Sequence, residues 1–142
     1  MTLVTEGVIH EVFFGFDAER LMLRIDTQRA AKEDLARLQE IRMQFVEPPG
    51  YEVRITDPGE PFLQAQLFHN RKLVAGADVQ AAAGQIFELT VRFADLGLEP
   101  EAPIHLYFEA IADGQSVDRA PREGVLETKV PGPDYEKVMW QV

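Results

Sequence analysis

Apolar and polar residues alternate in five separate segments of this chain, and no other feature restricts its fold as much. Successive side chains of a β-strand point to opposite faces, so alternation with a period of two is typical of strands that bury one face. The apolar positions are Leu21, Leu23 and Ile25; Ile41, Met43 and Phe45; Tyr51, Val53 and Ile55; Phe87, Leu89, Val91 and Phe93; and Ile104, Leu106, Phe108 and Ala110. We therefore predict five half-buried strands.

Four further segments have the composition of strands and lie between turn residues such as Pro48-Pro49-Gly50 and Asp113-Gly114. They are residues 8–14, 62–69, 72–78 and 125–130. About nine short strands with frequent turns indicate an antiparallel sandwich or barrel. A parallel sheet would need long crossover helices, which the sequence lacks. We expect an all-β fold, an antiparallel β-sandwich of about nine strands.

One segment departs from this alternation. Within residues 28–39, Ala31, Leu35 and Leu38 recur at helical spacing, which predicts one short helix of about three turns. Residues 93–98 are expected to end a strand in a single tight turn that Gly97 closes. The 142 residues contain no repeat and no boundary, so residues 1–142 are expected to form a single domain.

Composition argues against several kinds of partner. The 24 acidic and 14 basic residues give a net charge of −10, which repels the phosphates of nucleic acid and an anionic membrane surface. No stretch approaches the roughly 20 apolar residues that span a bilayer, and the N-terminus lacks the pattern of a signal peptide. Cysteine is absent, as suits a reducing compartment. We expect a cytoplasmic protein that binds neither nucleic acid nor membrane.

The residue types that usually carry catalysis are absent or isolated. None of the three histidines, His10, His69 and His105, has another histidine or a cysteine at the spacing of a metal site. Haem held by a methionine and a histidine has no local pattern in its favour. Ser116, the only serine, lies in a hairpin turn, and no motif fixes a pair of catalytic carboxylates. We expect a chain that is not an enzyme and holds no metal or cofactor.

Three stretches, spread over nearly the whole chain, contain short sequence motifs that together are typical of one protein family. Residues 12–26, VFFGFDAERLMLRID, place a Gly-Phe-Asp turn before a strand of Leu-x-Leu-Arg-Ile-Asp type. Residues 87–89 lead to Phe-Ala-Asp-Leu-Gly-Leu at 93–98, and the ending combines Arg-Ala-Pro at 119–121, Gly124, Val-Pro at 130–131 and Trp-Gln-Val at 140–142. Together they resemble the C-terminal domain of prokaryotic glycoside hydrolase family 57 proteins, the amylase-like group.

The resemblance implies a sandwich similar to type 9 carbohydrate-binding modules and to DOMON-like domains. It also implies that the partner is the catalytic domain of the parent polypeptide, which would hold the nucleophile and the acid. The expected function is that of a non-catalytic accessory domain that packs on this catalytic domain and takes an α-glucan or a similar saccharide as its ligand. Sugar-binding type 9 modules clamp their ligand between exposed tryptophans, whereas this chain has Trp140 alone.

A saccharide site needs an exposed ring beside groups that bond to hydroxyls. The outward-facing candidates are Arg24, Gln66, Tyr107 and Glu109, provided that their strands are neighbours. Trp140 has two interpretations, either a stacking platform for sugar or a buried anchor that docks the apolar residues 135–142 onto the sandwich. Docking is the expectation that we favour, because this segment is too apolar for a free end.

The alternative function is a structural or oligomerisation domain without a ligand. Such a domain would need an apolar surface patch. Met22, Ile111 and Phe68 are the candidates, because each occupies a nominally outward position of its strand.

Overall fold

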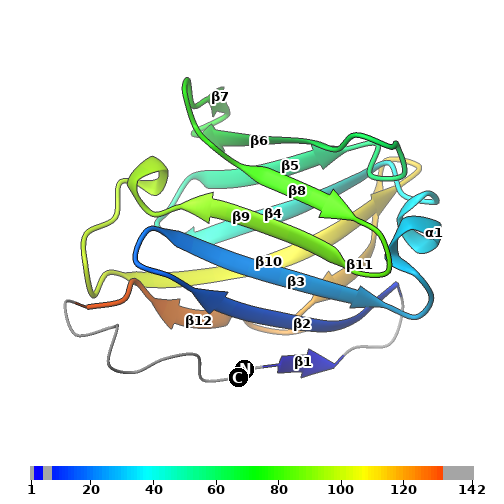
Figure 1. Cartoon of the computed structure of the whole chain (residues 1–142), viewed down its shortest axis with the longest axis horizontal. Helices are drawn as coiled ribbons and strands as arrows, with labels where there is room; N and C mark the ends of the chain where they lie inside the picture. The colour runs from blue at the N-terminus through cyan, green and yellow to red at the C-terminus, as the bar shows by residue number, and fades with distance from the viewer. Residues whose placement is uncertain (1, 5–7, 133–142) are drawn as a thin grey trace.

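The computed structural model describes residues 2–4 and 8–132, which form two antiparallel sheets packed face to face (Figure 1). The first sheet has the strand order β1-β2-β3-β9-β8, and the second has the order β11-β10-β4-β5-β6-β7, with β12 paired to the first half of β10. The strands of the first sheet are β1 (Thr2–Val4), β2 (Ile9–Phe16), β3 (Arg20–Thr27), β8 (Gln80–Ala83) and β9 (Phe87–Arg92). Those of the second are β4 (Glu40–Glu47), β5 (Tyr51–Thr56), β6 (Gln64–His69), β7 (Lys72–Leu73), β10 (Pro103–Ala112), β11 (Gln115–Ala120) and β12 (Leu126–Lys129).

The core lies between the two sheets and is built from the alternating positions. In β3 and β9 the apolar members are buried and the residues between them face outward, and β4 and β10 repeat this arrangement. Of the apolar positions in the five segments, all are buried except Tyr51, which is half-buried at the start of β5. The predicted all-β antiparallel sandwich is confirmed.

The described residues contain twelve strands, three more than the nine expected segments. The unpredicted strands are β1, β8 and β11, and only β7 forms within residues 72–78. The sequence of β8, Gln-Ala-Ala-Ala, has no polar and apolar contrast, so its pairing with β9 leaves no periodic signal.

The predicted helix is shorter than expected. Helix α1 covers only Ala31–Leu35, and the Asp34 carboxylate accepts a hydrogen bond from the Arg29 backbone N–H at 2.9 Å. After Leu35 the chain continues as a turn, because the Leu38 N–H donates three residues back, to the Leu35 carbonyl, at 3.0 Å. The prediction of a helix of about three turns is therefore wrong.

The tight turn after β9 forms as predicted. A 3-10 helix, η1 (Ala94–Leu96), ends at Gly97, whose φ of 67° lies in the left-handed region that glycine favours. Asp95 in this turn accepts two hydrogen bonds from Arg92, each 2.9 Å long, and one from the Asp78 backbone N–H, also at 2.9 Å. These bonds tie the loop before β8 to the end of β9.

Candidate functional site: the outer face of the seven-stranded sheet

The outer face of the seven-stranded sheet carries polar side chains in two parallel rows, each crossing adjacent strands. One row runs through Arg119, Glu109, Arg42, Arg54 and Gln66, on β11, β10, β4, β5 and β6. The neighbouring row runs through Tyr107, Gln44, Glu52 and Phe68, on β10, β4, β5 and β6. Because neighbouring strands lie about 4.8 Å apart, the two aromatic residues stand about 14 Å from each other. The second row is therefore a polar strip with an aromatic ring at each end.

Ion pairs hold two arginines of the first row, Arg42 and Arg54, in place. Arg42 Nε donates to Glu40 Oε1 at 2.7 Å, while Arg54 pairs with Glu52 and lies 3.8 Å from Glu40. The hydrogen bond to Glu40 raises the pKa of Arg42 above its ordinary value, against the effect of burial. Arg42 and Arg54 stand directly opposite each other in register, and Glu40 between them offsets the repulsion that like charges would cause. The face therefore presents fixed donors and acceptors with little net charge.

Each aromatic ring of the strip also contacts an arginine. The Arg54 guanidinium lies 5.0 Å from the centroid of the Phe68 ring, and that of Arg119 lies 4.1 Å from the centroid of the Tyr107 ring. Arg119 is itself fixed by hydrogen bonds to the carbonyls of Pro121 and Gly124, the second at 2.8 Å. Such cation–π contacts orient the rings. Each guanidinium therefore covers one face of its ring.

A hollow of about 340 Å³ opens at the Phe68 end of the strip. Its lining combines two amides, a carboxylate, two guanidiniums and aromatic rings: Gln44, Phe45, Gly50, Tyr51, Glu52, Arg54, Phe68, Asn70 and Arg71. Gly50 has a φ of 83°, in the left-handed region that glycine favours, and a Cβ built there would lie 2.3 Å from Asn70 Oδ1, so a larger residue would also displace the Asn70 side chain. The volume lies in the lower part of the range of small-ligand pockets.

Three of the five predicted site residues share this outer face. Tyr107 forms one end of the strip, and Glu109 and Gln66 lie in the adjoining row with Arg42 and Arg54 between them. Arg24 lies on β3 in the five-stranded sheet, so the sandwich separates it from the other three. Trp140 lies outside the described residues.

The apolar patch expected for a ligand-free domain does not form. Met22 lies on the five-stranded sheet and Phe68 on the seven-stranded sheet, so the two are on opposite sides of the molecule. Ile111 is only 7 % exposed, although it stands opposite Glu40 on the outward side of β10. The expectation that these three residues form one patch is wrong.

Several residues of the hollow were missed by sequence reasoning. The alternation placed Gln44, Glu52 and Arg54 on outward faces, but it carries no information on which strands are neighbours. Asn70 and Arg71 were identified only as a turn, and both have positive φ values, 51° and 69°.

Within residues 2–4 and 8–132 no group of three or more histidine, cysteine, aspartate or glutamate side chains is arranged to hold a metal ion. In the same part of the chain, no helix has the length and apolarity needed to cross a membrane. Comparison with family models, with curated proteins and with solved structures finds no match to this sequence.

Proposed function

We propose that this chain is a non-catalytic accessory domain of a carbohydrate-active enzyme and that it binds a saccharide on the outer face of the seven-stranded sheet. The observation that carries the proposal is the polar strip with its hollow: hydrogen-bonding groups of three kinds surround the Phe68 ring, and Tyr107 stands at the far end of the same row. Saccharides present hydroxyls in the plane of the ring and C–H groups on its faces, so their sites combine fixed polar groups with aromatic side chains.

Charge is compatible with a neutral ligand. The net charge of the chain is −10, but Arg42 and Arg54 at the centre of this face are paired with Glu40 and Glu52, so the strip has no strong field of either sign. Together with the family 57 resemblance, this favours an α-glucan or a similar neutral saccharide as the ligand. The resemblance also supplies the second partner, the catalytic domain of the parent polypeptide, on which the sandwich would pack.

The proposal is tested by calorimetric titration of the chain with maltooligosaccharides of increasing length. Gln44→Leu keeps the size of the side chain but removes its hydrogen bonds, and we expect it to weaken binding by about three- to tenfold. The matched control is Gln80→Leu on β8, an exposed glutamine of the opposite sheet, which should leave the affinity unchanged. Equal losses in both variants would contradict the proposed site.

A second assay addresses catalysis. Incubation of the chain with starch and chromogenic glucosides should give no turnover, since the nucleophile and acid are assigned to the parent polypeptide. Turnover that disappears when one carboxylate is replaced would overturn the accessory role.

The alternative function is a ligand-free structural or oligomerisation domain, and it replaces the saccharide-binding proposal if no saccharide binds at all. Sedimentation at several protein concentrations would then report self-association.

A further inference from the structure

The hollow at the Phe68 end of the polar strip does not reach the other end. Its lining includes Phe68, Glu52 and Gln44, whereas Tyr107 takes no part in it. Tyr107 belongs to the same row but lies three strands away, on β10, which places it about 14 Å from Phe68. A ligand that filled only the hollow would therefore leave the Tyr107 end of the strip empty.

The strip between the two rings is unbroken. Glu52 stands opposite Phe68 on one side and opposite Gln44 on the other, and Gln44 stands opposite Tyr107. The register is regular through these pairs, because the shift between β10 and β4 lies before Tyr107. The four side chains therefore form one continuous row across β6, β5, β4 and β10.

Unused hydrogen-bonding groups are spread over the whole width of this face. Within residues 2–4 and 8–132, no hydrogen bond is formed by the side chains of Gln66, Asn70, Gln44 and Tyr107. Gln66 and Asn70 lie at the Phe68 end, whereas Gln44 lies on β4 and Tyr107 at the far end. Amide and phenol groups both donate and accept hydrogen bonds, as saccharide hydroxyls do. A single sugar unit in the hollow would reach the groups at one end only.

We propose that the ligand of this face is an oligosaccharide that lies across the strands, with one sugar unit in the hollow and a later unit of the same chain at Tyr107. The inference rests on the proposed saccharide-binding function and adds to it which saccharides bind well. The hollow is the primary position, because amide, carboxylate and guanidinium groups surround it. Tyr107 is a distal position that a saccharide reaches only when it spans about 14 Å, so the affinity should rise at that length and change little beyond it.

The first test uses the unaltered chain. The isotope-labelled protein is titrated with glucose and then with maltooligosaccharides of increasing length, and nuclear magnetic resonance signals are followed at both ends of the strip. Glucose and the shortest maltooligosaccharides should shift the signals of Phe68 and Asn70 and leave those of Tyr107 constant. The Tyr107 signals should begin to move at one particular length, and the dissociation constant should fall at the same length. Equal sensitivity of both ends to glucose, or constant Tyr107 signals with every ligand, would contradict the inference.

Calorimetric titration of two variants measures what each end contributes. Phe68→Leu should weaken the binding of short and long saccharides alike by about three- to tenfold, because all of them occupy the hollow. Tyr107→Leu should weaken the binding of long saccharides by about the same factor and leave that of short ones unchanged. The matched control is Phe13→Leu on the opposite sheet, where an arginine lies 5.0 Å from the ring centroid, as it does at Phe68. This control should change no affinity.

The outcomes separate this inference from the proposed function. If no saccharide of any length binds, the proposed function fails and the inference fails with it. If saccharides bind but Tyr107→Leu weakens short and long ones by the same factor, or the affinity does not depend on length, the inference alone is overturned. Equal losses in Phe13→Leu and Phe68→Leu would contradict the proposed site as well. If urea unfolding shows that a variant does not fold, the titration of the unaltered chain decides.

Discussion

Replacing Phe108 by alanine tests the physical basis of the fold. Phe108 is fully buried on β10, where it stands opposite Met43 of β4 on one side and Ala120 of β11 on the other. Removing its ring leaves a cavity that neither neighbouring strand can close without breaking its pairing. Phe→Ala changes at such sites cost about 3–5 kcal/mol, against a total stability of about 5–15 kcal/mol for an ordinary domain.

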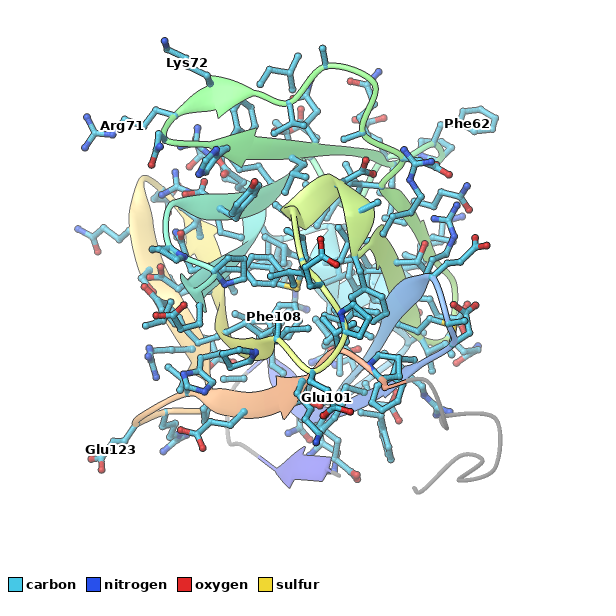
Figure 2. All side chains as sticks on the ribbon, turned by 90° about the vertical axis from the view of Figure 1, so that its left-hand side faces the viewer. Phe62, Arg71, Lys72, Glu101, Phe108 and Glu123 are labelled. Atoms are coloured by element: carbon cyan, nitrogen blue, oxygen red, sulfur yellow. The ribbon has the colours of Figure 1, made fainter. Side chains whose placement is uncertain are left out.

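The matched control for this substitution is Phe62→Ala. Phe62 is 90 % exposed, and Figure 2 shows it at the periphery while Phe108 lies inside. Its replacement should change stability by less than about 0.5 kcal/mol. In urea unfolding followed by far-ultraviolet circular dichroism, Phe108→Ala should lower the midpoint by roughly 1–4 M at an unchanged slope. Equal midpoints for the two variants would refute the assignment of Phe108 to the core.

Two further predictions concern the end of the sandwich near η1. Burial raises the pKa of Asp95, but the hydrogen bonds from Arg92 and from the Asp78 N–H outweigh it and hold this pKa below 3.8. The ionised Asp95 therefore stabilises the folded state fully above pH 3.8, and this stabilisation is lost as the pH falls through the lower pKa that Asp95 has in the folded state. Asp95→Asn should lower the free energy of unfolding by about 1–3 kcal/mol at pH 7 and by progressively less in acid. An equal cost at every pH in urea titrations would contradict this. Gly97→Ala should lose about 1–2 kcal/mol because of its left-handed φ, whereas Gly84→Ala, with no atom within 4 Å of the new Cβ and no positive φ, should lose nothing. Matching midpoints for the two glycine variants would refute the strain argument.

How far the sequence predicts this fold depends on how local each signal is. The buried face of β3 follows from the order of residues 21–25, because alternation is a property of a single strand. That β3 pairs with β9, more than 60 residues away, has no such local signal, and this pairing decides which outward residues meet. For this reason alternation alone cannot show that Arg24 and Tyr107 lie on opposite sheets. Ile111 stands opposite Glu40 on the outward side of β10 and is nevertheless buried, which alternation within one strand does not report.

The candidate site likewise depends on both local alternation and the pairing of distant strands. Gln44, Glu52 and Phe68 could each be read as outward-facing, but only the order β10-β4-β5-β6 brings them into one row with Tyr107. The hollow beside them also needs the close approach of Gly50 and Asn70, which are 20 residues apart and meet because β5 and β6 are paired.

The central claim, that the outer face of the seven-stranded sheet binds a saccharide, is tested most directly by a nuclear magnetic resonance titration. The isotope-labelled chain is titrated with a long maltooligosaccharide, and amide and side-chain signals are followed on both sheets. We expect concentration-dependent shifts for Gln44, Glu52, Phe68 and Asn70, with smaller ones at Tyr107, and constant signals for Arg24 and Thr90 on the opposite face. Shifts confined to the five-stranded sheet, or none at millimolar saccharide, would contradict the claim.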